Sequence, residues 1–332
     1  MSALLDVRDL RVGVGKREVT EVVTGLSFSI DKGRRMGVVG ESGSGKSVTA
    51  LAIMRLLRPP LRILGGSVLL DGVDLMSLSE RKMNAVRGGR IGMIYQDPMS
   101  ALNPVLSIGA QISEAIRLHN DVSRMVARAQ AIDLLGDVGM PRPSQRYDAY
   151  PHEFSGGMRQ RVIIAMAISA MPEVLIADEP TTALDVTTQA RIMDLLSSIS
   201  EARNIATILI THDLAVASSF CDEITVMYAG QIVERAGVRS FYERPVHPYS
   251  EALLSAAIDL TVPVDLPIKT IGGQPPHPGE ILGSCSFYPR CPFAEPICIE
   301  ERPKLVEVTD AVVACHFAEL RSLRQREVVV DD

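Results

Sequence analysis

The sequence predicts an α/β fold that carries an inserted helical subdomain and ends in a small, irregular module. The first observation is that apolar, β-rich runs alternate with segments of helical pattern, which is typical of a domain with a largely parallel sheet. The second is that the strand signal disappears between Pro104 and Met171, where amphipathic segments take over. The third is a stretch rich in proline and glycine after residue 260, which leads into a segment with little periodicity.

Three strand–helix pairs define the α/β part. They are "RMGVVG" at 35–40 before "KSVTALAIMRLL" at 46–57, "VLIAD" at 174–178 before "VTTQARIMDLLSSIS" at 186–200, and "ATILIT" at 206–211 before "DLAVASSF" at 213–220. The inserted helices, within about 104–171, include "IGAQISEAIRLH" at 108–119 and "RMVARAQAIDLLGDVG" at 124–139. At ~150 residues per domain, a chain of 332 residues suggests about two domains, and we expect one over residues 1–260 and a second over 261–332.

Composition and charge restrict the class of protein. The chain has 332 residues, of which 46% are hydrophobic and 22% charged, so it can bury a substantial core. Its longest nearly uncharged run, "VIIAMAISAM" at 162–171, is well short of the ~20 residues that cross a bilayer, and the N-terminus does not resemble a secretory signal. A net charge of -6 differs from the net positive charge that is typical of nucleic-acid-binding domains. We expect a cytoplasmic protein with no nucleic-acid partner.

A phosphate-binding loop is predicted by "GESGSGKS" at 40–47, which fits G-x-x-x-x-G-K-[ST] between a strand and a helix. In such a loop backbone N–H groups surround phosphate oxygens, Lys46 reaches the β and γ phosphates, and Ser47 holds Mg²⁺. The alternative is a tight glycine-rich turn without a ligand, which the strand before and the helix after disfavour. The candidate nucleotide-binding residues are Gly40, Ser42, Gly43, Gly45, Lys46, Ser47 and Val48.

Two adjacent carboxylates, Asp178 and Glu179, follow the apolar run at 174–177. Ligands bind at the carboxyl ends of strands in open α/β sheets, so Asp178 is expected to orient Mg²⁺ and Glu179 to polarise the water that attacks the γ-phosphate. Two acids after a strand can instead cap a helix. Taken alone, the pair leaves both interpretations open.

A second anion-binding geometry is indicated by "FSGGMRQRV" at 154–162, where a serine and two glycines stand at an expected helix start. With this motif the sequence resembles the ATPase subunits of ABC transporters, whose signature SGGxxQ is matched by Ser155, Gly156, Gly157 and Gln160. The resemblance implies a RecA-like P-loop ATPase fold. It also implies head-to-tail pairing of two subunits, in which each signature closes over the ATP held by the other subunit.

Three further family motifs occur in the expected order within residues 4–258. By resemblance, Gln96 senses Mg²⁺ and the attacking water, Asp185 crosses the dimer interface, and His212 contacts the γ-phosphate. One departure concerns the base: the family usually stacks an aromatic ring on adenine, but the only aromatic residue before Gly40 is Phe28, which the pattern of "LSFSI" places in the core. We expect aliphatic side chains near residues 12–14 to take that role.

Longer matches resemble the D-type ATPase of bacterial dipeptide and oligopeptide importers, a group that also includes transporters of nickel chelates and glutathione. They are "GESGSGKSVTALAIMRLL", "FSGGMRQRVIIAMA", "VMYAGQIVE", "HPYSEALLSA" and "CSFYPRCPFAEPIC". The resemblance implies ATP-driven peptide import at the cytoplasmic face of the bacterial plasma membrane, with two permease subunits, an F-type ATPase or a second copy, and an extracytoplasmic substrate-binding protein. The permease would dock on the helical subdomain and the segment after Gln96. The rival class, ABC ATPases that act on nucleic acid or ribosomes, carries two cassettes or long coiled coils, which are absent here.

Four of the five cysteines, Cys285, Cys291, Cys298 and Cys315, gather near the end of the chain. Clustered thiols in a reducing compartment favour a metal over disulfides, and His316 beside Cys315 keeps a mixed zinc site open. Neither zinc nor ferredoxin spacings are matched, so spacing alone does not choose the metal. Resemblance to dipeptide-importer ATPases implies one [4Fe–4S] cluster on these four thiolates, structural or regulatory and distant from the ATP chemistry. Cys221 is left out because it is expected in the helix after His212.

Overall fold

The computed structural model describes residues 3–16, 18–97, 101–182, 184–256, 271–280 and 283–323. The chain forms two compact units, and each is assembled from separated stretches of sequence. Among the described residues, unit 1 comprises 3–5, 29–35 and 69–210, and unit 2 comprises 6–28, 36–68 and 211–323.

Unit 1 is built on three parallel strands in the order β6–β7–β8. Their bounds are Ile91–Ile94, Val174–Asp178 and Ala206–Ile210. Every residue of β7 from Val174 to Ala177 is fully buried, and burying each large apolar side chain stabilises the fold by about 1.5–3 kcal/mol. The carboxyl end of β7, where the two predicted acids lie, is therefore firmly fixed.

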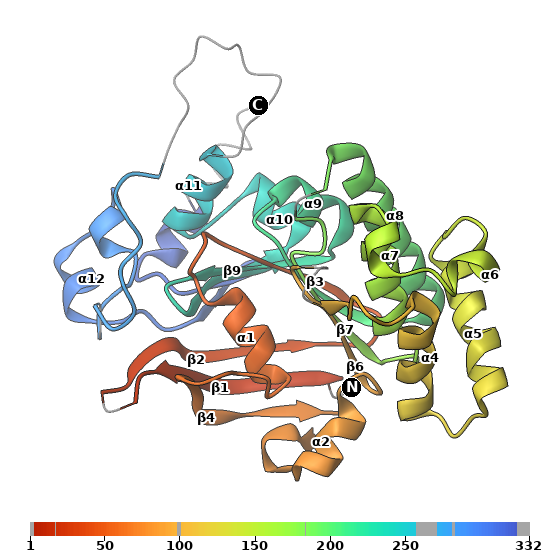
Figure 1. The fold of residues 1–332 in the computed structure, drawn as a ribbon. Helices are drawn as coiled ribbons and strands as arrows, with labels where there is room; N and C mark the ends of the chain where they lie inside the picture. The colour runs from red at the N-terminus through yellow and green to blue at the C-terminus, as the bar shows by residue number, and fades with distance from the viewer. Residues whose placement is uncertain are drawn as a thin grey trace. The chain divides into compact units, whose positions relative to one another are not determined.

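Between residues 104 and 171 the described chain of unit 1 contains helices and no strand, as the loss of strand signal predicted. The elements are α4 (Ile108–His119), α5 (Arg124–Asp137), α6 (Pro143–Arg146), the 3-10 turn η2 (Pro151–Glu153) and α7 (Gly156–Ala167). Helices α4, α5 and α7 pack on one another (Figure 1). Serine N-caps begin all three, because the hydroxyls of Ser107, Ser123 and Ser155 accept hydrogen bonds from N–H groups of the first turn.

The remaining elements of unit 1 are short, apart from one long helix. They are β5 (Val73–Asp74), η1 (Leu75–Ser77), α2 (Glu80–Val86) and α8 (Val186–Arg203).

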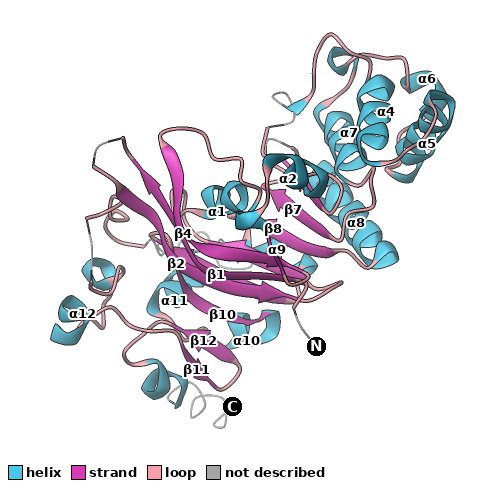
Figure 2. Cartoon of the chain, turned by 90° about the horizontal axis from the view of Figure 1, so that it is seen from below, coloured by secondary structure: helices cyan, strands magenta, loops and turns pink. Residues whose placement is uncertain are grey.

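Unit 2 holds strands of two sheets. One sheet has the order β2–β1–β4 in this unit, and the other runs β3–β9–β10–β12–β11, with β3 parallel to β9 and the later pairs antiparallel. Figure 2 shows β10, β12 and β11 next to one another. The strands, some of which extend a few residues beyond the unit, are β1 (Leu5–Val14), β2 (Thr20–Ile30), β3 (Arg35–Val39), β4 (Leu61–Leu70), β9 (Glu223–Tyr228), β10 (Gln231–Gly237), β11 (Val306–Val308) and β12 (Ala311–Val313). The helices are α1 (Lys46–Ile53), α9 (Leu214–Phe220), α10 (Val238–Glu243), α11 (Pro248–Ala256), η3 (Tyr288–Arg290) and α12 (Pro296–Glu300).

The C-terminal segment is more regular than its sequence indicated. Strands β11 and β12 form a hairpin that extends the sheet of unit 2, with Glu234 of β10 opposite Val313 of β12. Val313 is fully buried, so this segment shares the core of unit 2. The expected boundary near residue 260 lies outside the described residues. Cys221 was predicted inside a helix, but α9 ends at Phe220 and Cys221 is its C-cap.

No helix in the described part of the chain is both long and apolar enough to cross a membrane.

Candidate functional site

The predicted phosphate-binding loop joins β3 to α1 in unit 2. Three glycines in the loop have positive φ angles, 149° at Gly40, 82° at Gly43 and 100° at Gly45. A side chain at Gly40 would also collide with the chain, because a Cβ there would lie 2.2 Å from the carbonyl oxygen of Met227. The loop therefore requires glycine for its backbone conformation, as expected for a loop that wraps an anion.

Lys46, the first residue of α1, points back over this loop. Its Nζ donates hydrogen bonds to the carbonyl oxygens of Gly40 (2.8 Å) and Glu41 (2.9 Å) and to Oγ of Ser44 (3.4 Å). The residue is only 6% exposed. The ammonium group is thus held against the backbone of the loop, where phosphate oxygens can replace the carbonyl oxygens as acceptors.

The other predicted residues of the loop remain accessible. Ser42 and Gly43 are exposed, and Ser47 and Val48 are half-buried in the first turn of α1. The first N–H groups of a helix have no acceptor within the helix, so this turn offers donors to an anion.

Sequence reasoning missed the residues that hold the loop from outside. The backbone N–H of Glu41 donates to Oη of Tyr249 at 2.8 Å, and the carboxylate of Glu41 forms an ion pair with Arg290 at 2.7 Å. Arg290 lies between Cys285 and Cys291 in sequence. A side chain of the cysteine segment therefore contacts the phosphate loop, although the four cysteines were predicted to hold a cluster distant from the ATP chemistry.

The predicted catalytic glutamate lies in unit 1, directly after β7. Oε2 of Glu179 accepts hydrogen bonds from Nε2 of Gln96 (2.9 Å) and Oγ1 of Thr182 (2.8 Å). Glu179 has a φ of 46°, which is rare for a residue other than glycine and is often found at functional sites. Asp178 beside it is 5% exposed. The structure therefore brings Gln96 and Glu179 together, and it adds Thr182, which the sequence did not single out.

The signature motif, also in unit 1, divides into exposed and buried residues. Ser155 is the N-cap of α7, Ser155 and Gly156 are exposed, and Gly157 is half-buried. Gln160 is 1% exposed, and its Nε2 has no hydrogen-bond partner among the described residues. The turn around Ser155 can therefore meet a ligand directly, whereas Gln160 faces the interior of unit 1.

Asp185 in unit 1 and His212 in unit 2 each precede a helix. Asp185 is the N-cap of α8: its carboxylate accepts from the backbone N–H of Thr188 (3.0 Å) and from Oγ1 of the same threonine (2.7 Å). The Thr188 hydroxyl and N–H hold the pKa of Asp185 below its ordinary value. His212 lies between β8 and α9 with an exposed side chain. Asp185 therefore has a structural role that the sequence motif did not show.

The residues considered for adenine stacking are mostly in the core. Phe28 is 6% exposed in β2, in agreement with the core interpretation. Val12 is fully buried, whereas Val14 is only half-buried. Among the residues near 12–14, Val14 is the valine with side-chain surface available to a base.

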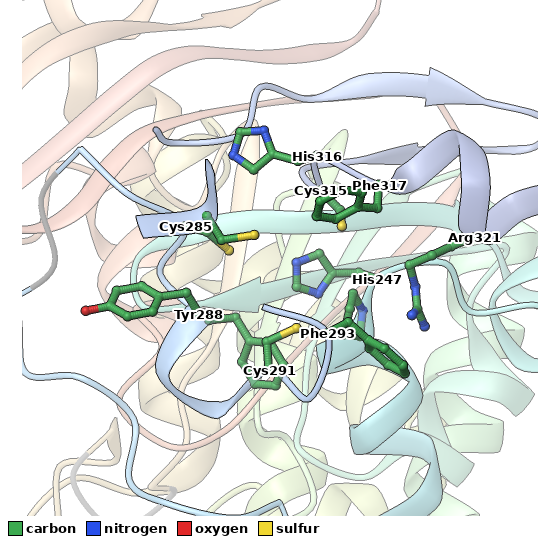
Figure 3. A pocket seen from close by; sticks show the side chains of 12 residues that line it. His247, Cys285, Tyr288, Cys291, Phe293, Cys315, His316, Phe317 and Arg321 are labelled. Carbon is green, nitrogen blue, oxygen red and sulfur yellow. The ribbon is translucent and has the colours of Figure 1, made fainter. Parts of the chain in front are cut away.

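The four clustered cysteines line one pocket in unit 2, together with His247, Phe287, Phe293 and Arg321 (Figure 3). The backbone N–H of Cys285 donates to the carbonyl oxygen of Cys298 at 2.9 Å, which joins two turns of the segment. All five cysteines of the chain are free thiols, so no disulfide closes the segment. Burial raises the pKa of Cys285 to about 11 and also raises the pKa of Cys291 and Cys315.

Within the described ranges, no three His, Cys, Asp or Glu side chains are placed to hold a single metal ion. Burial lowers the pKa of His247 to about 3, so this imidazole is neutral, and its Nδ1 accepts the N–H of Tyr249 at 3.0 Å. The ring of His316 forms a hydrogen bond with the carbonyl oxygen of Glu301. The pocket therefore offers thiols from four positions.

Comparisons with known proteins agree with these features. The ABC transporter family matches residues 23–182, and the C-terminal region of oligopeptide/dipeptide transporters matches residues 233–298. A probable peptide ABC transporter ATP-binding protein of Sinorhizobium fredii is 48% identical over 92% of both chains. The oligopeptide transport protein OppD of Escherichia coli is 46% identical over 97% of this chain and 95% of its own, and DppD, the dipeptide transport protein of the same organism, is 44% identical over 95% and 97%.

Solved structures show the same fold. The dimeric ATP-binding cassette MJ0796, bound to ADP and Pi, has a TM-score of 0.64 and is 25% identical over 71% of this chain and 99% of its own. The protein cbiO1 of Clostridium perfringens has a TM-score of 0.62 at 25% identity, over 72% of this chain and 90% of its own. The fold is that of an ABC ATPase cassette, and the chain belongs to the family of ATP-binding proteins of peptide ABC transporters.

Proposed function

We propose that this chain hydrolyses ATP to power the import of dipeptides and oligopeptides through a separate membrane permease. The observation that carries the proposal is a phosphate loop with a buried lysine and a hydrogen-bonded Gln96–Glu179 pair, in a chain 44–48% identical over nearly its whole length to proteins named for peptide transport.

Each predicted residue has a chemical role in this function. Lys46 and the N–H groups of residues 40–48 bind the phosphates, and Ser47, Gln96 and Asp178 supply oxygen ligands for Mg²⁺. Glu179 orients the attacking water, since a carboxylate that accepts from Gln96 and Thr182 is held in one direction. His212 contacts the γ-phosphate. Magnesium held there by Ser47, Gln96 and Asp178 would neutralise the negative charge that develops on the phosphate groups.

The active form is a dimer in which the signature of one subunit meets the nucleotide of the other. The exposed N-cap turn of α7 supports this, because Ser155 and Gly156 are accessible. The cassette MJ0796 is described as dimeric, which agrees with the proposal. Asp185 lies at the same interface, and the buried Gln160 supports the signature turn from within unit 1. The second subunit is an F-type ATPase or another copy of this chain.

The permease, which consists of two membrane subunits, docks on the helical subdomain and on the segment after Gln96, of which residues 98–100 lie outside the described residues. Exposed apolar side chains in this region support such a contact: Val105 is 76% exposed, Leu118 72% and Met125 80%. The chain accordingly works at the cytoplasmic face of the membrane, and a substrate-binding protein delivers peptide on the other side. We further propose that the ATPase domain covers residues 1–260 and that the cysteine module covers residues 261–332.

The cysteine pocket holds one [4Fe–4S] cluster. The support is that all four thiols line one pocket, and four cysteine thiolates are the ligand set of such a cluster. Burial raises the pKa of Cys285, Cys291 and Cys315, so binding must release protons and is expected to weaken as the pH falls. Protein purified without oxygen should contain about four iron and four sulfide per chain. Stoichiometric zinc without iron would contradict the cluster and leave the ATPase function untouched.

The test of the function is uptake of a labelled dipeptide by cells that depend on this gene. Wild type should restore uptake and Glu179→Gln should not, although both proteins are present at equal levels. Unlabelled dipeptide should compete, whereas nickel chelate and glutathione should not. Competition by one of those cargoes alone would overturn the peptide assignment and retain the transporter.

A further inference from the structure

The cysteine segment contacts the phosphate loop through one buried side chain. The guanidinium of Arg290 forms a two-pronged ion pair with Glu41, with Nη1–Oε2 at 2.7 Å and Nη2–Oε1 at 3.0 Å. The side chain of Arg290 is only 3% exposed. Paired bonds of this geometry fix the orientation of both partners and are stronger than neutral hydrogen bonds. Arg290 therefore fixes the position of the Glu41 side chain.

The remaining donors of Arg290 anchor it to its own surroundings. Its Nε donates to the carbonyl oxygen of Gly272 (2.8 Å), Nη2 to that of Ile271 (3.3 Å), and Nη1 to Oη of Tyr228 (3.2 Å). A guanidinium with this many acceptors has little freedom to turn away from Glu41.

Glu41 passes this restraint to the lysine that faces the phosphates. Its backbone N–H is bonded to Oη of Tyr249 (2.8 Å), and its carbonyl oxygen accepts from Nζ of Lys46 (2.9 Å). The side chain and both backbone groups of this one loop residue are therefore engaged. The contacts form a continuous path from Arg290 through Glu41 to Lys46.

The turn that carries Arg290 is held by the cysteine pocket. Arg290 ends η3, and the N–H of Cys291 after it donates to the carbonyl oxygen of Tyr288 (3.3 Å), whose own N–H donates to that of Cys285 (3.1 Å). Phe287, before η3, is 1% exposed and packs on Tyr228 at a ring distance of 5.2 Å. The backbone between the two cysteines thus places the guanidinium.

We propose that Arg290 is a positioning residue for the nucleotide site: it holds Glu41 so that the phosphate loop and Lys46 are already in the conformation that binds ATP. The cysteine segment then sets nucleotide affinity without touching the nucleotide. This inference rests on the proposed function only in that the loop binds ATP. It does not depend on which metal, if any, the pocket binds.

The test is equilibrium binding of Mg·ATP, measured calorimetrically in a Glu179→Gln background so that the nucleotide is not consumed. Arg290→Ala should weaken binding by roughly 10- to 100-fold, the range for loss of hydrogen bonds to a charged group. Arg290→Lys, which keeps the charge but not the two-pronged geometry, should give an intermediate affinity. The matched control is Arg244→Ala, which removes an arginine paired with Asp310 of the same C-terminal segment and should leave affinity unchanged.

A double-mutant cycle separates positioning from general damage. Glu41→Ala alone should weaken binding about as much as Arg290→Ala, and the double variant should be no weaker than either single variant, because both act through one contact. Strictly additive losses, or wild-type affinity for a folded Arg290→Ala protein, would overturn the proposal. If Arg290→Ala does not fold, the lysine variant and Glu41→Gln decide in the same way. If the protein that keeps Arg290 does not bind ATP, the proposed function itself is refuted instead.

Discussion

Two groups of candidate residues, a binding part in unit 2 and a catalytic part in unit 1, are held in different ways. In unit 2 the phosphate loop is supported by buried groups: Lys46 is 6% exposed, and Glu41 is fixed by Tyr249 and Arg290. In unit 1 the exposed Gln96 reaches Glu179, which accepts two side-chain hydrogen bonds on one oxygen at a strained backbone position. The binding part is pre-organised by packing, and the catalytic part by a few polar contacts. Substitutions of Lys46 or of the residues that fix Glu41 should accordingly change affinity, and substitutions of Glu179 or its partners should change turnover.

The largest effect is expected for Glu179→Gln. This change keeps the shape of the side chain but removes the charge that orients water, so turnover should fall by about two to four orders of magnitude while ATP binding is retained. Steady-state phosphate release and equilibrium binding, measured on one preparation, test both parts. Normal turnover would reject Glu179 as the catalytic base.

Lys46→Ala should act on affinity. It removes a positive charge from the phosphate loop, and loss of hydrogen bonds to a charged group predicts roughly 10- to 100-fold weaker binding. Lys82→Ala, which removes an exposed lysine of α2, is the control and should bind as wild type does. If Lys46→Ala binds ATP as tightly as wild type does, the phosphate loop does not determine affinity, and the distinction between a binding part and a catalytic part is wrong.

Blocking the cysteines tests whether their pocket affects ATP affinity through Arg290. Alkylation of the metal-free protein adds bulk to the pocket that places Arg290, so it should weaken ATP binding by up to about 10-fold, a fraction of the loss predicted for removing the arginine contact. The reaction should be slow at neutral pH and faster in alkali, because burial raises the pKa of Cys285, Cys291 and Cys315. An Arg290→Ala protein should show almost no further loss on alkylation. An equal loss in both proteins would mean that the pocket acts on the loop by another route.

Thr182→Val tests how Glu179 is held. The variant loses one hydrogen bond to Oε2 of Glu179, and a net value of about 0.5–1.5 kcal/mol predicts a 2- to 10-fold fall in turnover at unchanged affinity. Ser198→Ala, which also removes a hydroxyl of unit 1 but not a contact of Glu179, serves as the control for turnover. A larger change in affinity than in turnover would contradict the assignment of Thr182 to the catalytic part.

The smallest effect concerns pH and Asp185. Its pKa is lowered in the folded protein by Thr188, so the carboxylate stabilises the fold above its unfolded pKa, and this contribution is lost as the pH falls through the folded value. Thermal unfolding of wild type should therefore show a small loss of stability below about pH 4 that Asp185→Asn lacks. The exposed Asp194 on the same helix provides the control, Asp194→Asn. Identical pH profiles for wild type and Asp185→Asn would show that the cap contributes nothing measurable.

The features predicted well from sequence are local ones. The strand, glycine turn and helix around Lys46 are encoded within the consecutive residues 35–53, and the all-helical stretch between 104 and 171 follows from continuous periodicity. Strands β11 and β12 were missed because three residues each are too few to show a period of two.

The features that sequence could not predict depend on distant residues. Glu41 and Arg290 are 249 residues apart, and neither has a local signal for its partner. The burial of Gln160 and the cap formed by Asp185 likewise depend on packing rather than on the motif. Motifs thus identified the chemical groups, and the structure added what positions them.

The most direct measurement compares Mg·ATP affinity and turnover in Glu179→Gln and in Arg290→Ala prepared side by side. The account predicts that Glu179→Gln binds ATP as wild type does but hydrolyses it very slowly. It also predicts that Arg290→Ala binds roughly 10- to 100-fold more weakly but, at saturating ATP, hydrolyses it at nearly the wild-type rate. The reverse pattern, with affinity lost in Glu179→Gln and retained in Arg290→Ala, would contradict the division between a binding part in unit 2 and a catalytic part in unit 1.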